Sequence, residues 1–148
     1  MTTTHFDIKR LHATIDEMSD LLSRELDTLE QFNLTDQQEN YLMYCVTNAP
    51  LTAKELVEEF QVSKSAISQV VAKLEKERFI EREKNPENLR ETLIYLGPKG
   101  RMFARRLEEF NSKIQNEYYV HLTSDEIKQM ISSIEKLNKV IKENQSGS

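Results

Sequence analysis

Apolar residues recur at three- and four-residue intervals over most of this 148-residue chain. That spacing places them on one face of an α-helix, which turns by about 100° per residue. The pattern predicts a first helix from Phe6 to about Leu29, whose heptad-like seam has to pack against another helix. The partner is either a second chain or the C-terminal helices of the same chain. The seam consists of Ile8, Leu11, Ile15, Met18, Leu22 and Leu29, with Leu26 beside it.

Three capping boxes mark the starts of further helices. Thr35, Thr52 and Thr123 each precede a Gln or Glu by three residues, so each pair can satisfy two backbone N–H groups at a helix start. They predict a helix that ends at Ala49-Pro50, a short helix, and a last helix that frays over residues 144–148.

The region from Val62 to Gly100 combines a helix with a pair of strands. Ser63 can cap a helix, because its hydroxyl accepts hydrogen bonds from the first backbone N–H groups. Strand-forming residues then fill Phe79–Lys84 and Glu91–Leu96, with turn-forming residues between them. Gly97-Pro98 opens the next helix, since Pro is tolerated in a first turn. The buried stripe of the helix after Ser63 is predicted to be Ile67, Val70, Val71 and Leu74.

The opposite face of this helix carries hydroxyls, one amide and lysines, and no carboxylate. A face of this kind can enter a major groove, where Ser and Gln read base edges and Lys binds phosphate. A solvated surface helix has the same composition, so this face alone leaves both interpretations open. If the helix reads DNA, Ser65, Ser68 and Gln69 read bases, and Lys64 and Lys73 hold phosphate. Ser63 lies at the start of the same surface.

The predicted hairpin adds a second basic element beside this helix. Lys84 and Arg90 flank its tip, and Asn88 lies within it. An arginine at such a tip can enter the narrow minor groove, where the negative potential is strongest. The hairpin is then a wing, although an ordinary surface hairpin would look the same. The short helix after Thr52 and the turn at Gln61-Val62 complete a helix-turn-helix, and that motif followed by a wing is the more specific signal.

These motifs together resemble the MarR family of winged-helix transcription regulators. The resemblance covers most of the chain and implies a mainly α fold with a small β-wing, whose first and last helices interleave in a homodimer. It divides the chain into a helical dimerisation region, 1–34 and 107–148, and a winged helix-turn-helix DNA-binding domain, 35–106. The matching residues are Ser63–Ser68, Leu74–Lys76, Ile80–Arg82, Asn88–Arg90, Leu96, Lys99 and Gly100.

Two positions depart from the family pattern. The family usually has Asp, which helps to orient the wing, where this chain has Asn88. It usually has Gly at the end of the reading helix, where this chain has Arg78. Arg78 therefore has to adopt a left-handed conformation at some cost, or the helix has to end in another way.

The net charge of −5 is distributed unevenly. Residues 1–62 carry 4 Lys/Arg against 12 Asp/Glu, residues 63–106 carry 11 against 6, and residues 107–148 carry 5 against 7. The proposed DNA-reading region is thus locally basic, as nucleic-acid binding requires. The chain has one cysteine, which fits a reducing compartment, and no apolar signal-peptide core at Met1–His5. It also has no apolar run near the ~20 residues of a membrane span. We therefore expect a cytoplasmic protein outside the membrane.

The chain has no catalytic or metal-binding motif, so we expect neither an enzyme nor a cofactor. Some members of the MarR family, which this chain resembles, sense metals or oxidants through His or Cys. Here His5, His12 and His121 have no metal-ligand spacing, and isolated surface histidines are common. Cys45 lies among apolar residues, which favours a small buried hydrophobe over a redox sensor.

The resemblance also implies a small aromatic or lipophilic effector in a cleft beside the DNA-binding domain. The candidate lining residues, which also fit an ordinary core, are Met18, Tyr41, Tyr44, Phe103 and Phe110.

The sequence thus predicts a homodimeric regulator that binds a pseudo-palindromic operator in double-stranded DNA, and the resemblance implies that it is a repressor. The alternative is a winged-helix module that docks on proteins, because a fold does not fix a function. The acid-free helix face and the local positive charge favour DNA.

Overall fold

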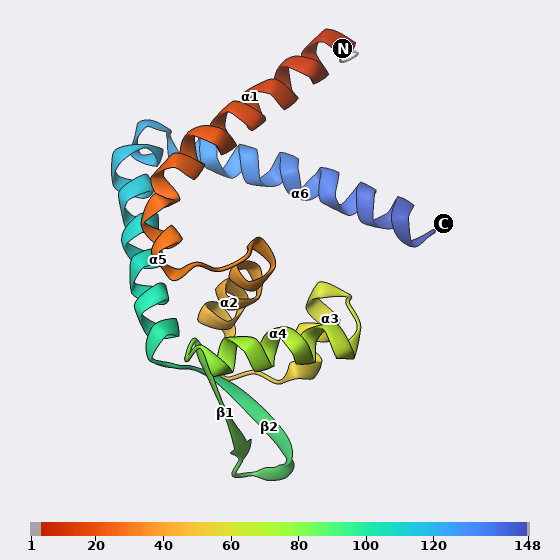
Figure 1. Ribbon diagram of the computed structural model, residues 1–148. Coiled ribbons are helices and arrows are strands. Elements are labelled where there is room, and N and C mark those ends of the chain that lie inside the picture. The colour runs from red at the N-terminus through yellow and green to blue at the C-terminus, as the bar shows by residue number, and fades with distance from the viewer. Residues whose placement is uncertain (1–3, 148) are drawn as a thin grey trace. The chain divides into compact units, whose positions relative to one another are not determined.

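The computed structural model describes residues 4–147, apart from the side chains at positions 27 and 28. Figure 1 shows a mainly helical chain with one two-stranded antiparallel sheet, which confirms the predicted fold class. The chain forms two compact units, Met1–Phe110 and Asn111–Ser148. The predictions for Met1–Thr3 and for Ser148 fall outside the described residues. The elements are α1 His5–Glu25, the 3-10 helix η1 Leu26–Phe32, α2 Asp36–Asn48, α3 Ala53–Phe60, α4 Lys64–Lys76, β1 Ile80–Asn85, β2 Asn88–Leu96, α5 Pro98–Glu117, the 3-10 helix η2 Tyr119–His121 and α6 Ser124–Ser146.

The predicted helix starts are confirmed by their hydrogen bonds. Thr35, Thr52 and Thr123 form complete capping boxes, in which each hydroxyl accepts from a backbone N–H three residues later. The hydroxyl of Ser63 accepts from the backbone N–H of Ala66 at 3.1 Å. These caps are local in sequence, which is why the pattern located them correctly. One capping box was not predicted, and it joins Thr4 to Asp7 at the start of α1.

The first helix is shorter than predicted. α1 ends at Glu25 instead of near Leu29, and the chain continues as η1. Leu29 is buried in the core, and the ring of Phe32 packs edge-on against Phe79 and Phe103, with centroids 6.1 and 5.5 Å apart. Burying these two side chains outweighs the continuation of a regular helix, because tertiary packing routinely overrides local preference.

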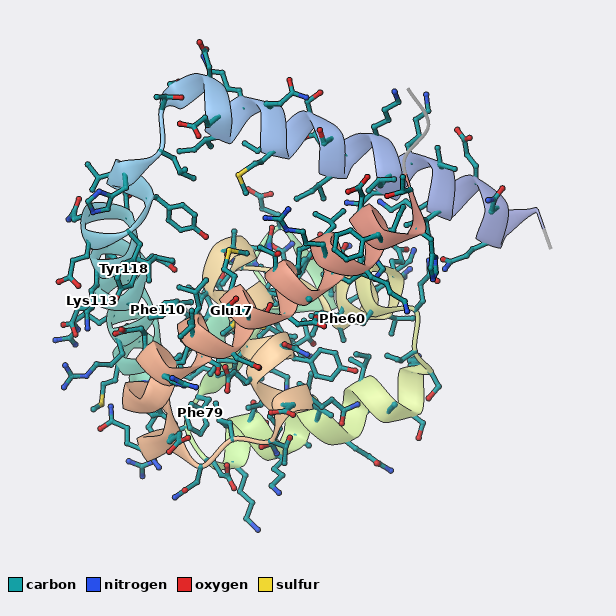
Figure 2. All side chains as sticks on the ribbon, turned by 90° about the horizontal axis from the view of Figure 1, so that it is seen from above. Glu17, Phe60, Phe79, Phe110, Lys113 and Tyr118 are labelled. Atoms are coloured by element: carbon teal, nitrogen blue, oxygen red, sulfur yellow. The ribbon has the colours of Figure 1, made fainter. Side chains whose placement is uncertain are left out.

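The described part of the first unit has one buried core, which residues 35–106, here called the winged region, largely supply. Phe79, labelled in Figure 2, and Phe103 are both fully buried in it. Ile67, Val71 and Leu74 are buried as predicted, but Val70 is only half-buried, since it lies at the edge of the stripe. The core cluster is Leu29, Tyr41, Leu42, Cys45, Leu51, Leu56, Ile67, Val71, Leu74, Phe79, Ile80, Ile94 and Phe103.

Gly100 marks the tightest backbone approach in the winged region. A Cβ built at this position would collide with the carbonyl oxygen of Phe79, so the start of α5 packs directly on the segment that joins α4 to β1. Gly97 is similarly confined, with the carbonyl oxygen of Arg78 only 2.6 Å from where its Cβ would be. Both glycines are therefore needed for close packing, not for an unusual φ angle.

The wing is longer and its turn is tighter than predicted. β1 runs to Asn85 and β2 begins at Asn88, so Asn88–Arg90 belongs to a strand and only Pro86 and Glu87 form the turn. The strands pair Ile80 with Leu96 and Lys84 with Thr92, and the register shifts after Lys84. A separate bridge joins Leu51 to Ile94 by two backbone hydrogen bonds of 3.2 and 2.7 Å. The hairpin is thereby attached to the loop between α2 and α3.

The terminal helices have no buried residue. Each instead exposes a row of large apolar side chains, including Leu11 on α1 and Ile134 on α6. α6 remains helical to Ser146, so the predicted fraying is wrong over residues 144–146. The hydroxyl of Ser146 donates to the carbonyl of Lys142 at 2.9 Å, which supports the last turn. Within residues 4–147, no helix combines the length and apolar character needed to cross a membrane.

Candidate nucleic-acid interface

The exposed face of α4 has the composition that the sequence predicted. Ile67, Val71 and Leu74 face the core, and the polar residues on the other side are exposed to solvent. A helix with one polar, acid-free side of this kind can be inserted into a major groove without bringing a carboxylate against phosphate. The exposed residues are Ser63, Lys64, Ser65, Ser68, Gln69, Ala72, Lys73 and Lys76.

The wing presents the other predicted residues on its surface. Lys84, Asn88 and Arg90 are all exposed, on the hairpin that projects from the helices of the first unit (Figure 1). Leu89, between Asn88 and Arg90, is also largely exposed. Among the residues that the structure describes, no carboxylate pairs with the Arg90 guanidinium, so it is available to a ligand outside the chain.

Two asparagines determine the shape of the wing tip. The side-chain oxygen of Asn88 accepts from the backbone N–H of Arg90 at 3.2 Å, and that of Asn85 accepts from the backbone N–H of Glu87 at 3.0 Å. The amide nitrogen of Asn85 also donates to the carboxylate of Glu91 at 3.0 Å. An amide oxygen therefore supplies the acceptor that an Asp carboxylate would offer at position 88. The departure from the family pattern keeps the local turn chemistry.

Arg78 adopts the left-handed conformation, which was one of the two options that the sequence left open. Its φ is 67°, and its backbone N–H donates to the carbonyl of Glu75 at 3.0 Å. Its own carbonyl accepts from the backbone N–H of Lys99 at 3.0 Å. A left-handed residue with a Cβ costs about 1–2 kcal/mol. The surrounding backbone bonds offset that cost and direct the chain from α4 into β1.

An ion pair that the sequence did not predict connects α4 to the wing. The Arg82 guanidinium donates through Nη2 to Oε1 of Glu75 at 2.7 Å and through Nε to Oε2 at 3.1 Å. These hydrogen bonds hold the pKa of the Glu75 carboxyl below its ordinary value, and the pKa of Arg82 is raised in turn. Opposite charges at a helix end and at the start of the next strand were the signal available in the sequence.

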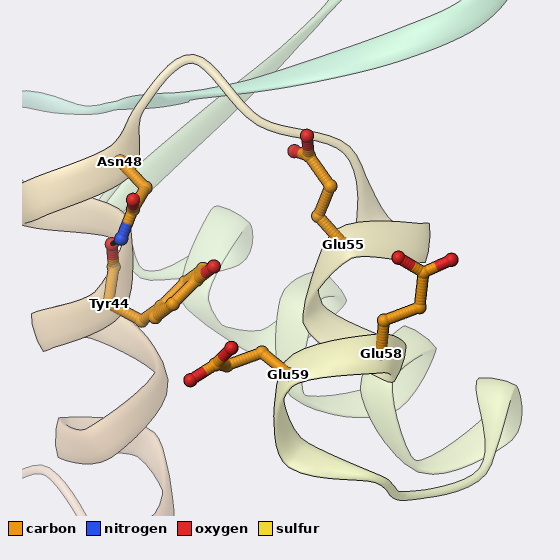
Figure 3. Close-up of a pocket in the computed structure, with 5 residues that line it drawn as sticks. All are labelled: Tyr44, Asn48, Glu55, Glu58 and Glu59. Carbon is orange, nitrogen blue, oxygen red and sulfur yellow. Dashed lines mark hydrogen bonds between the residues drawn. The ribbon is translucent and has the colours of Figure 1, made fainter. Parts of the chain in front are cut away.

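The candidate effector residues lie in different environments. Tyr41 and Phe103 are buried in the core, Tyr44 and Phe110 are half-buried, and Met18 is exposed on α1. Tyr44 lines a pocket between α2 and α3 (Figure 3). The other lining residues are Asn48, Glu55, Glu58 and Glu59. Partial burial, then the carboxylates of Glu59 and Glu55, raise the pKa of Tyr44. That pocket is acidic and is poorly suited to an anionic ligand.

Cys45 is only 1% exposed, as expected of a small core residue. Burial raises the pKa of its thiol to about 11, so the thiol is protonated and weakly nucleophilic at neutral pH. His5 and His12 lie on α1 and His121 lies in η2, all of them exposed. Over residues 4–147, no group of three His, Cys, Asp or Glu side chains is arranged to bind a metal ion.

Comparisons with known proteins agree with this geometry. A family model described as MarR family matches residues 32–91. A Bacillus subtilis (strain 168) protein, named as the uncharacterized HTH-type transcriptional regulator YwhA, is 33% identical over 86 residues. The match covers 58% of this chain and 62% of YwhA, so the chain spans less than two thirds of that relative's length. The resemblance to the MarR family is confirmed.

Solved structures extend the likeness to nearly the whole chain. The crystal structure of MarR is 26% identical with a TM-score of 0.56, covering 90% of this chain and 96% of that one. Streptococcus pneumoniae FabT, crystallised in complex with DNA, is 17% identical with a TM-score of 0.75, covering 93% and 99%. At that identity, FabT shows a shared fold.

Proposed function

From the MarR-family likeness of its winged helix, we propose that this chain is a DNA-binding transcription regulator and not an enzyme. The observation that carries the proposal is the acid-free, exposed face of α4 beside the exposed Arg90 of the wing. A major groove admits one helix, and the adjacent minor groove attracts an arginine. YwhA is named as a transcriptional regulator, and FabT was crystallised with DNA.

The residues of α4 divide the work by chemical type. Ser65, Ser68 and Gln69 read base edges, because hydroxyls and amides match the donor and acceptor pattern of the major groove. Lys64 and Lys73 hold phosphates on either side, which fixes the register of the helix without specifying sequence. Ser63, Lys84 and Asn88 complete the contact surface at its edges.

The terminal helices support a homodimer that binds a pseudo-palindromic operator. Large apolar side chains are exposed in rows along α1 and α6. Contiguous exposed apolar residues are typical of association surfaces, which supports a second copy of the chain as the partner. A second copy would cover them and hold two α4 helices apart. Half-sites about one turn of DNA apart, on the order of 34–36 Å, would then be read together.

Repression is the simplest regulatory outcome of this arrangement, since a bound dimer blocks access to the DNA that it covers. A small aromatic or lipophilic effector would release the DNA by binding among the candidate cleft residues Met18, Tyr41, Tyr44, Phe103 and Phe110. The regulator would act in the cytoplasm.

The test is selection of bound sequences from a random pool of duplex DNA, followed by binding measurements at 50 and 200 mM salt. A regulator enriches a two-fold symmetric motif and binds it more weakly at the higher salt. Failure to bind any duplex at 50 mM salt would exclude a DNA regulator and favour a module that docks on proteins.

A further inference from the structure

The wing leaves α4 through a short hinge. Only residues 77–79 separate the last residue of α4 from the first residue of β1, and Arg78 in the middle is left-handed. The hinge backbone is held on both sides. The N–H of Phe79 donates to the carbonyl of Leu74 at 2.8 Å, and the carbonyls of Phe79 and Arg78 accept from the N–H groups of Gly97 and Lys99 at 2.9 and 3.0 Å. Simultaneous contact with a major groove and the adjacent minor groove requires a defined angle between helix and hairpin.

The pair of Glu75 and Arg82 bridges this hinge through side chains. Glu75 lies in the last turn of α4 and Arg82 lies near the start of β1. The guanidinium meets the carboxylate through two hydrogen bonds, of 2.7 and 3.1 Å. A two-pronged contact of this kind fixes orientation as well as distance, because both groups are planar.

A purely stabilising role does not account for this pair. The side chains of Arg82 and Glu75 are 38% and 36% exposed, respectively. Exposed ion pairs typically contribute less than about 1 kcal/mol to the free energy of folding. A direct phosphate contact by Arg82 is also a poor explanation, because Nε and Nη2 are already directed at Glu75.

We propose that Glu75 and Arg82 are positioning residues, whose ion pair sets the angle of the wing so that Arg90 and the α4 face engage neighbouring grooves together. The proposal rests on the DNA-binding function proposed above and deepens it. Neither residue needs to touch DNA. The carboxylate of Glu75, which would repel phosphate on its own, is neutralised by the same contact.

Replacement of Glu75 by Gln separates a charge effect from a positioning effect, because the two predict opposite changes in the affinity for the operator. Removing a negative charge near a DNA-binding surface should strengthen binding by simple electrostatics. Loss of the positioning contact should instead weaken operator binding on the order of tenfold, the range of coupling found between contacting residues. Glu81→Gln removes the same charge from the position beside Arg82 in β1, where no ion pair is formed among the described residues, and should bind at least as tightly as the parent.

A double-mutant cycle separates positioning from charge. With positioning, Glu75→Gln, Arg82→Gln and the double variant should all be weakened by about the same factor, because each breaks the same contact. Arg82→Lys, which keeps the charge but not the planar fork, should be weakened as well. Full affinity in Arg82→Lys, or stronger binding in Glu75→Gln, would overturn the proposal.

The coupling to Arg90 provides a measurement that a general loss of stability would not change. Once the wing is misplaced, Arg90→Ala should cost much less in the Glu75→Gln background than in the parent chain. An equal cost in both backgrounds would contradict the positioning role. All of these variants are measured on the selected operator. A parent chain that binds no DNA would exclude the proposed function. If the parent binds and Glu75→Gln binds with the same affinity, only the positioning role is excluded.

Discussion

The winged region and the terminal helices treat their apolar residues in opposite ways. The winged region buries Phe79, Phe103, Ile67 and their neighbours in one core. α1 and α6 have comparable apolar spacing, yet they bury no residue, and Ile134 is 52% exposed. The same helical periodicity therefore has two outcomes here, burial in the core of the first unit or exposure to solvent along α1 and α6.

The strongest challenge to this comparison is a charge on the exposed face of α6. Ile134→Asp would place an unpaired carboxylate in the proposed dimer seam, so self-association should weaken by at least about 100-fold. Sedimentation equilibrium should then report a monomer, and operator binding should fall with it. Ser132→Asp, on the opposite side of the helix, is the matched control and should remain a dimer. A dimer that survives Ile134→Asp would show that α6 is not the seam.

The self-contained core should be most sensitive at Gly100. Gly100→Ala would drive a methyl group into the carbonyl of Phe79, which should cost about 3 kcal/mol of unfolding free energy, at the upper end for overpacking. Urea denaturation of the purified protein gives this value directly. Unchanged stability would mean that the contact between Phe79 and the start of α5 can relax, and that the core is less tightly constrained than its geometry indicates.

A smaller effect, confined to DNA binding, is expected at the wing. Arg90→Ala should weaken operator binding about tenfold and reduce the salt slope, because one cationic contact is lost. The melting temperature and the mass in solution should not change, since the side chain is exposed and unpaired within residues 4–147. Fluorescence anisotropy at several salt concentrations provides the measurement. Undiminished affinity would remove the wing from the mechanism.

Relief of backbone strain should give a modest gain. Arg78→Gly replaces a left-handed residue that carries a Cβ, so the free energy of unfolding should rise by about 1 kcal/mol. Thermal melting would detect the shift. A loss of stability would indicate that the Arg78 side chain makes a contribution larger than the strain.

The smallest effect is expected at Cys45. Its folded pKa of about 11 lies above the unfolded value, so the buried thiol favours the folded state at neutral pH, and that contribution is lost as the pH rises toward 11. Iodoacetamide at pH 7.5 should therefore modify the native protein very slowly and the urea-unfolded protein quickly. Peroxide-treated parent and Cys45→Ser should bind DNA equally well, whereas loss of binding by the parent alone would make Cys45 a sensor.

Features encoded within a few residues were predictable from the sequence. The caps at Ser63, Thr35 and Thr52 and the exposed face of α4 follow from local hydrogen bonding and helical period. The end of α1 was not predictable in this way, because it depends on Leu29 and Phe32 reaching a core supplied by distant segments.

The wing shows the same limit on a smaller scale. Turn-forming residues located the hairpin, but the strand ends depend on which side-chain acceptors Asn85 and Asn88 provide. The contact between Glu75 and Arg82 crosses a left-handed hinge, so no helical or strand periodicity brings the two residues together. The opposite charges are visible in the sequence, but choosing this pair among the other charged residues nearby required the three-dimensional path of the chain.

The burial of the lone thiol has a practical consequence for studying motion. Because Cys45 is shielded, a cysteine introduced at the exposed Leu89 should react selectively with a maleimide dye in the otherwise unaltered chain. A fluorophore there would report the orientation of the hairpin in solution, with and without an oligonucleotide. Energy transfer between two such labels would also measure how far apart the hairpins lie in the proposed dimer.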